Sequence, residues 1–181
     1  FIHQCPPNGP GVTVLIMMKL LEKLNIHNYK FNSAERFHLE AEVTKQAYKV
    51  KETSLGDPSF VNFDLNEILS NKNIDDIFNK INLNSCSDVG DLNIPAHPET
   101  IYLTVVDKDL NSVSIINSVC YVFGSGITTN KSGILLHNRG TNFRVEHGHP
   151  NCIEGLKRPL HTIIPGMVID KNNNTTLSYG V

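Results

Sequence analysis

The sequence changes character at residues 98–107, which read Pro98-Glu99-Thr100-Ile101-Tyr102-Leu103-Thr104-Val105-Val106-Asp107. From Ile101 onward this stretch is apolar and β-branched, a pattern typical of a strand. Lys108-Asp109-Leu110-Asn111 supplies a turn, and residues 112–122 read as a second strand. We therefore predict a hairpin, and its partly continuous apolar faces predict burial on both sides.

Upstream of this stretch the sequence is patterned as helices. Residues 12–25 carry one apolar stripe at helical spacing, made of Val14, Met17, Met18, Leu21 and Leu24. Asn32-Ser33-Ala34-Glu35 resembles a capping box and predicts a second helix that ends at about Lys51. Shorter helices are predicted over residues 60–71 and 74–83. Residues 84–93 lack periodicity and are predicted to form an exposed loop.

Downstream of the hairpin the sequence predicts only short strands, over residues 133–136, 162–169 and 176–181. The residues Lys171-Asn172-Asn173-Asn174 are predicted to form the turn between the last two. The order is therefore helices, then a loop, then antiparallel strands, which predicts the α+β class.

Composition and charge exclude several classes of protein. The 181 residues are 40% hydrophobic and 19% charged, which excludes a disordered, collagen-like or coiled-coil chain. The formal net charge is −2 and no block of Lys or Arg is present, so we expect neither a nucleic acid nor a membrane as partner. The longest apolar run, residues 12–18, is too short to span a bilayer.

The ends of the chain and the cysteines lead to expectations about the length of the protein, its compartment and the state of its thiols. Phe1 and Val181 do not look like natural termini, so we expect a piece of a longer protein. No signal peptide is visible in the sequence, and its residues do not distinguish a cytoplasmic from a periplasmic protein. The four cysteines are scattered without a CxxC pair, which predicts reduced thiols, with Cys120 in a core.

Thr100 occupies the junction between the predicted loop and the predicted hairpin. If the chain were cut before Thr100, its hydroxyl and a new α-amine would belong to the same residue. A free α-amine has a pKa near 8 and can serve as base for the adjacent hydroxyl. The sequence pattern alone equally allows Thr100 to be an ordinary β-branched strand residue.

Several blocks of sequence, in order along the chain, resemble the gamma-glutamyltranspeptidase family of N-terminal-nucleophile hydrolases. They are Pro6-Pro7-Asn8-Gly9, Ser33-Ala34-Glu35, Thr100 with residues 104–114, Phe123-Gly124-Ser125-Gly126-Ile127, residues 132–139, Pro150-Asn151 and residues 157–165. The resemblance implies part of a four-layer αββα sandwich, made as a precursor that cuts itself into two subunits. Residues 1–99 would then belong to the large subunit and residues 100–181 to the small one.

The resemblance also implies a mechanism. Glu99–Thr100 would be the cleaved bond and Thr100 the nucleophile, whose hydroxyl forms an acyl-enzyme and passes the acyl group to water or an amine. Ser118 stands where the family has a second Thr beside the nucleophile. The partners would be a small gamma-glutamyl compound or acylamide, together with the remaining subunit segments of the same precursor. No cofactor is implied.

The resemblance also places a set of substrate-binding residues, at Asn138, Arg139, Asn142, His161 and Thr162. Members that handle glutathione have Asn, Gln and Asp where this chain has Cys120, Arg139 and Asn142, and two serines in place of His161-Thr162. Asn142 lacks the negative charge that would pair with a substrate ammonium. Arg139 adds a cation suited to a carboxylate. These departures resemble the transpeptidase-like or cephalosporin-acylase-like subgroup.

Three functions therefore remain open. They are a gamma-glutamyltransferase or glutathione hydrolase-like amidase, an acylase-like amidase for another carboxylate-bearing substrate, and an inactive truncated remnant of such an enzyme. The family's Gly-Gly pair would follow residue 181, so we expect this piece alone to be inactive. His147-Gly148-His149 lies in a Gly/Pro/Asn-rich stretch, which predicts a solvated loop, and no metal site is predicted.

Overall fold

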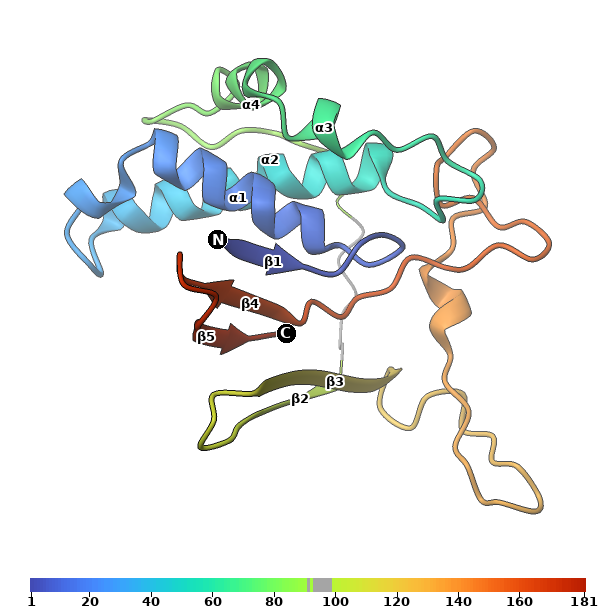
Figure 1. Cartoon of the computed structure of the whole chain (residues 1–181). Coiled ribbons are helices and arrows are strands. Elements are labelled where there is room, and N and C mark those ends of the chain that lie inside the picture. Colours follow the sequence, from blue (N-terminus) through green and yellow to red (C-terminus); the bar gives the residue numbers. More distant parts are fainter. Residues whose placement is uncertain (91, 93–98) are drawn as a thin grey trace.

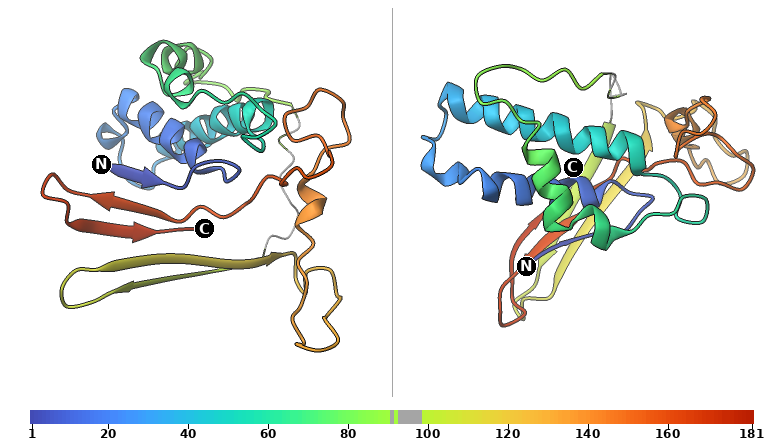
Figure 2. Two further views of the ribbon diagram at one scale, coloured as in Figure 1. Left: turned by 45° about the vertical axis from the view of Figure 1, so that its right-hand side comes forward. Right: turned by 90° about the horizontal axis from the view of Figure 1, so that it is seen from above.

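The chain is arranged in layers, with helices over one face of a small sheet and a hairpin on the other face (Figure 1 and Figure 2). The computed structural model describes residues 1–90, 92 and 99–181. Mixed helix and antiparallel sheet was the predicted class, and it is confirmed. Among the described residues, no helix has both the length and the apolar character that a bilayer crossing needs.

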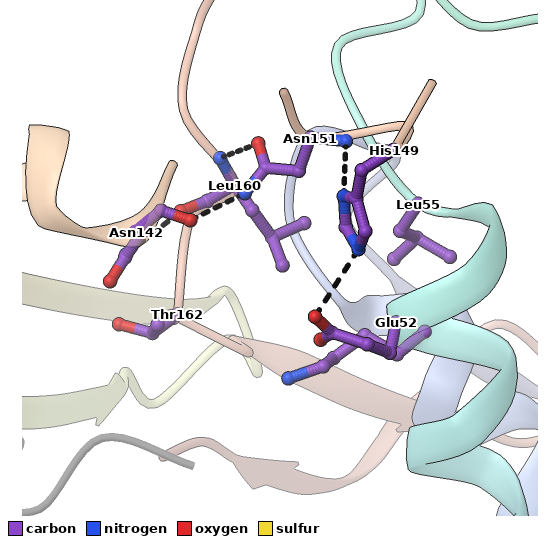
Figure 3. A pocket seen from close by; sticks show the side chains of 8 residues that line it. Glu52, Leu55, Asn142, His149, Asn151, Leu160 and Thr162 are labelled. Carbon is purple, nitrogen blue, oxygen red and sulfur yellow. Dashed lines mark hydrogen bonds and ion pairs between the residues drawn. The ribbon is translucent and has the colours of Figure 1, made fainter. Parts of the chain in front are cut away.

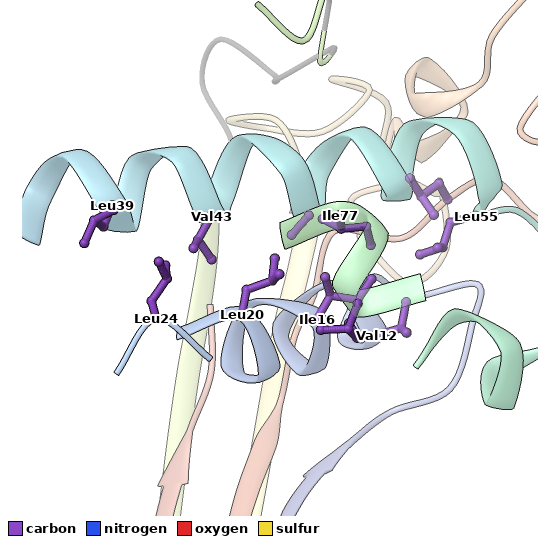
Figure 4. Close-up of a cluster of buried hydrophobic side chains, with 11 residues drawn as sticks. Val12, Ile16, Leu20, Leu24, Leu39, Val43, Leu55 and Ile77 are labelled. Carbon is purple, nitrogen blue, oxygen red and sulfur yellow. The ribbon is translucent and has the colours of Figure 1, made fainter. Parts of the chain in front are cut away.

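Two long helices form the helical layer. Helix α1 spans Gly11–Lys23, and helix α2 spans Ala34–Ser54, where the Ser33 hydroxyl accepts a hydrogen bond from the Arg36 backbone N–H as the predicted cap. Helix α3 (Leu65–Ile68) and helix α4 (Asn71–Phe78) lie over them. Figure 4 shows the core between these helices. It contains Val12, Ile16, Leu20, Leu24, Leu39, Val43, Ala47, Leu55, Ile74, Ile77 and Leu160.

Two antiparallel sheets stack beneath the helices. One has the order β1-β4-β5, from strands Ile2–Gln4, Gly166–Ile169 and Thr175–Tyr179. The other is the predicted hairpin, β2 (Glu99–Val106) and β3 (Ser112–Cys120). Tyr102 joins the sheets, because its hydroxyl lies 2.9 Å from the Ser178 hydroxyl and its ring fills the space where a Cβ on Gly180 would stand.

One face of the hairpin is not covered, which contradicts the predicted burial on both sides. Ile101, Leu103 and Val105 are 74%, 56% and 54% exposed. These alternate residues point to one face of the strand. The sheet β1-β4-β5 lies against the opposite face, where the Tyr102 hydroxyl meets the Ser178 hydroxyl. The continuous apolar pattern correctly predicted a strand but not its burial within these residues.

Several short elements also differ from prediction. The helix expected over residues 60–71 is confined to α3, and α4 begins and ends before the helix expected over 74–83, because Asp64 and Ser70 cap new helix starts. The strand expected over residues 133–136 is reduced to one bridge between Thr128 and Leu135. Strand β4 starts at Gly166, directly after Pro165, which has no N–H for a ladder.

Strand β1 was not predicted, since three residues beside a Pro-rich stretch carry no periodicity. It pairs with β4 through Ile2 opposite Val168 and His3 opposite Met167. Segments from the two ends of the chain therefore share one sheet. The predicted division at residues 99 and 100 remains a prediction, but it does not separate two independent cores, because Leu160 packs with the helices.

Replacing Leu20, which is fully buried, by Ala should lower the free energy of unfolding by about 2–5 kcal/mol, because the cavity left between α1 and α2 cannot collapse completely. Leu156 is 100% exposed and serves as the matched control, since Leu156→Ala removes no buried contact. Urea unfolding of both variants measures the difference. Equal stabilities would contradict this core.

Candidate active site

Thr100 and Ser118 lie side by side on the hairpin. The Thr100 Oγ1 donates a hydrogen bond to the Ser118 Oγ over 3.2 Å, and the Ser118 Oγ accepts another from the Cys120 backbone N–H at 3.0 Å. An irregularity in register between Glu99 and Ile101 occurs at this point. The structure therefore brings together the two hydroxyls that the family resemblance paired. The side chain of Glu99, the residue before the predicted cleavage point, lies outside the described residues.

Thr100 opens into a pocket of about 540 Å³ between the helical layer and the two sheets. This volume lies in the range of small-molecule sites. Its lining is mainly apolar and comes from both predicted subunits. The lining residues are Pro10, Thr13, Val14, Met17, Tyr48, Lys51, Thr100, Tyr102, Leu160, His161, Thr162, Ile164, Gly180 and Val181. His161 and Thr162 thus share a wall with Thr100, whereas Asn138, Arg139 and Asn142 do not line this pocket.

Arg139 is a buried cation directly behind that wall. Only 3% of the residue is exposed, and its Nη1 donates to the Thr162 Oγ1 over 2.6 Å. Its Nη2 is buried without a hydrogen-bond partner, and no carboxylate among the described residues pairs with it. A buried charge without a counter-ion lowers the stability of the fold, and the described residues supply no anion that pairs with this guanidinium.

His161 is held in an uncharged environment. Burial, followed by the charges of Arg139 and His137, lowers the pKa of His161 below its ordinary value. The ring is therefore neutral at pH 7. Its Nδ1 is buried without a hydrogen-bond partner in the described part of the chain, and so is the Thr13 hydroxyl on the same pocket.

The side chains of Asn138 and Asn142 form hydrogen bonds with other residues of the protein. The Asn138 Oδ1 accepts from the Tyr121 backbone N–H over 3.1 Å. The Asn142 Nδ2 donates to the Leu160 carbonyl over 2.9 Å, and its Oδ1 lies 3.9 Å from the Cys120 Sγ. All four cysteines are free thiols and Cys120 is buried, as predicted. In this structure the two amides position the backbone around the pocket.

A polar cluster that sequence reasoning missed braces the same region (Figure 3). The Asn151 Nδ2 donates to the Asn142 carbonyl over 2.5 Å, and its Oδ1 accepts from the Leu160 N–H over 3.1 Å. The His149 Nδ1 accepts from the Asn151 N–H, and its Nε2 lies 3.3 Å from the Glu52 Oε1. The prediction of a solvated loop is therefore wrong for His149, because α2 supplies a carboxylate that no local pattern reveals.

The comparison with known proteins identifies the family. The chain matches the profile of Gamma-glutamyltranspeptidase over residues 1–181. It belongs to that family. The glutathione hydrolase-like YwrD proenzyme of Bacillus subtilis is 33% identical over 99% of the chain, and the glutathione hydrolase proenzyme of Escherichia coli is 31% identical over 97%. The chain covers 33% of the length of each of these two relatives.

A solved structure shows the same fold. The crystal structure of cephalosporin acylase from Bacillus halodurans aligns with a TM-score of 0.75 and 26% identity, over 98% of this chain and 31% of that one. This gamma-glutamyltranspeptidase family member therefore shares its arrangement of helices, sheet and hairpin with a part of that acylase.

The segment that carries His161 and Thr162 is anchored to the end of α2 by a buried carboxylate. The Asp57 side chain is 2% exposed and accepts from the Arg158 backbone N–H at 2.8 Å, Nε at 3.0 Å and Nη2 at 2.7 Å. These Arg158 hydrogen bonds hold the pKa of the Asp57 carboxyl far below its ordinary value. This family member therefore positions one wall of its pocket with an ion pair.

Asp57→Asn should lower the free energy of unfolding by about 3 kcal/mol at pH 7, because the buried acceptor loses its charge and faces N–H donors. The depressed folded-state pKa stabilises the fold above pH about 4 and ceases to do so as the pH falls towards that pKa. The difference in the free energy of unfolding between wild type and Asp57→Asn should therefore be constant from neutral pH to about 5 and decrease below about 4.

The control is Asp109→Asn, since the Asp109 side chain is 65% exposed and pairs with its neighbour Lys108 in the hairpin turn. Chemical denaturation at a series of pH values gives both comparisons. The anchoring role would be contradicted if Asp57→Asn lowered the free energy of unfolding no more than Asp109→Asn does. It would also be contradicted if the loss caused by Asp57→Asn increased in acid.

Proposed function

We propose that this chain is the central part of a self-processing amidase in which Thr100 is the nucleophile, residues 1–99 contribute to the large subunit and residues 100–181 to the small one. The observation that carries the proposal is the Thr100–Ser118 hydroxyl pair, 3.2 Å apart, at the mouth of a pocket lined by both segments. Family membership and the proenzyme relatives support it.

Self-processing would use the same hydroxyl as catalysis. The Thr100 Oγ attacks the carbonyl carbon of Glu99, the C–N bond breaks, and the nitrogen becomes the free α-amine of Thr100. Water then hydrolyses the resulting ester and releases a carboxylate on Glu99. In the processed protein the α-amine takes the hydroxyl proton while Thr100 attacks a substrate amide. The Ser118 hydroxyl, which accepts from Thr100, orients that attack.

The acyl group then leaves Thr100 by a second attack. The first attack releases the substrate's amine and leaves an ester on the Thr100 oxygen. Water or an acceptor amine attacks that ester, which gives hydrolysis or transfer and restores the hydroxyl. The glutathione hydrolase relatives support a gamma-glutamyl group as the acyl part.

The charges around the pocket favour a related substrate class within the same mechanism, an amide with a distal carboxylate and no α-ammonium. No Asp or Glu is among the described residues that line the pocket, so nothing there pairs with an ammonium. The buried Arg139 supplies an uncompensated positive charge behind Thr162. Val14, Met17 and Leu160 provide an apolar path for an aliphatic acyl chain.

Self-processing is tested by intact mass. Thr100→Ala in the full-length precursor should leave one uncut species, whereas wild type gives two fragments and a new N-terminal Thr, because the substitution removes the attacking oxygen. Thr104→Ala, on the same strand with its hydroxyl donating to the Val113 carbonyl, is the matched control and should cut normally. An uncut wild type would favour the inactive remnant.

Substrate class is tested with three p-nitroanilides of similar length. The glutaryl amide has the distal carboxylate, the gamma-glutamyl amide adds an ammonium, and the butyryl amide has neither charge. We expect kcat/KM to rank them glutaryl, gamma-glutamyl, butyryl.

Arg139→Gln should reduce the preference for glutaryl over butyryl by about tenfold, because it removes the buried positive charge behind Thr162 that attracts the substrate carboxylate. The butyryl rate itself serves as the internal control for folding. A preference for butyryl that Arg139→Gln leaves unchanged would contradict carboxylate recognition, and a gamma-glutamyl preference would return the assignment to glutathione-like substrates.

A further inference from the structure

A second group of reactive side chains lies on the helical layer, and none of its members lines the pocket at Thr100. Within residues 1–90, 92 and 99–181, the candidate ligand atoms of His38, Glu42 and Cys86 all lie within 4.8 Å of one another. His38 and Glu42 are four positions apart on α2 and so share one face of the helix. Cys86 comes from the segment after α4.

Glu42 is the buried member of this group. Its side chain is 1% exposed, the Oε1 accepts from the Lys45 Nζ over 2.8 Å, and the Oε2 accepts from the Ser87 backbone N–H over 3.0 Å. A carboxylate has about four acceptor positions, so the hydrogen bonds from Lys45 and Ser87 leave acceptor capacity for another ligand. Because Ser87 is the neighbour of Cys86, the second hydrogen bond also holds the thiol close to the carboxylate.

His38 is oriented by a carbonyl. Its Nε2 lies 2.9 Å from the Asn82 carbonyl oxygen and, as the donor, leaves the lone pair of the ring on Nδ1. A histidine whose second nitrogen donates to a carbonyl is the usual arrangement of a metal ligand, because that contact fixes the ring and its tautomer. Thus His38 and Glu42 are each held by hydrogen bonds and keep acceptor capacity, and the exposed Cys86 lies beside them.

We propose that His38, Glu42 and Cys86 bind one Zn²⁺, with water as the fourth ligand. Imidazole, carboxylate and thiolate together match the preferences of this borderline-soft ion. Ligands of one Zn²⁺ lie closer together than 4.8 Å, so binding draws the exposed Cys86 inward, and the thiol proton passes to solvent as the Zn–S bond forms.

The bound ion would attach the segment from Asn82 to Ser87 to helix α2. This segment precedes the predicted cleavage point at Glu99–Thr100 in the chain. Zinc binding itself does not depend on the proposed amidase, so a protein that never cleaves would still bind the metal. A failure of the metal test therefore leaves the assignment of Thr100 untouched, and the reverse also holds.

The test uses Co²⁺ as a spectroscopic probe and Zn²⁺ as competitor, with the whole 181-residue chain. Wild type should bind one equivalent of Co²⁺ with a thiolate-to-cobalt charge-transfer band, and Zn²⁺ should displace it. Cys86→Ser should abolish the band and weaken Zn²⁺ binding by at least about tenfold, because an alcohol is a poor ligand for this ion. Cys5→Ser, which removes the other exposed thiol, is the matched control and should leave both unchanged.

His38→Gln should weaken Zn²⁺ binding to a similar extent while the far-ultraviolet circular dichroism stays that of wild type, since His38 is only partly buried. The proposal is overturned if wild type shows no charge-transfer band, if the band survives in Cys86→Ser, or if Cys5→Ser loses it.

Discussion

The ion pair between Asp57 and Arg158 is the constraint on which the pocket depends. It joins the loop after α2 to a segment far along the chain, and the Arg158 backbone takes part as well as the guanidinium. Directly after Arg158, Leu160 lies in the helical core, and His161 and Thr162 lie on the wall beside Thr100. A carboxylate buried this deeply persists because its donors replace the water it has lost.

The same segment is held from its other side by neutral hydrogen bonds. Asn151 and Asn142 together satisfy the N–H and the carbonyl of Leu160, so this buried backbone has no unpaired group. Hydrogen bonding is less complete at the pocket, where His161 and Thr13, and Arg139 behind Thr162, each keep a buried polar atom without a partner among the described residues. The backbone of Leu160 is fully hydrogen-bonded, whereas several polar side-chain atoms near the pocket are not. Such unpaired polar atoms lower the stability of the fold, and this pattern is typical of a ligand site.

Much of the fold follows from local pattern. The apolar periodicity predicted α1, but its buried face is Val12, Ile16 and Leu20, whereas Met18 of the predicted stripe is 41% exposed. The Ser33 cap predicted the start of α2, and the β-branched run before Asp107 predicted the hairpin. The prediction was wrong where a short segment has no partner of its own. Strand β1 exists only because β4 lies beside it, and the strand expected around Leu135 lacks such a neighbour beyond one bridge.

By itself, the sequence determined the α+β class, the family and the residue at which loop gives way to strand, because these depend on local propensity and on the order of motifs. Only the tertiary structure decided that Thr100 meets Ser118 on the hairpin and shares a pocket with His161, and that Arg139 lacks a counter-ion among the described residues. It also decided that His149 faces Glu52 and that His38, Glu42 and Cys86 converge. Each of these depends on which distant segments pack together, and burial, charge pairing and ligand geometry arise only after that packing is complete.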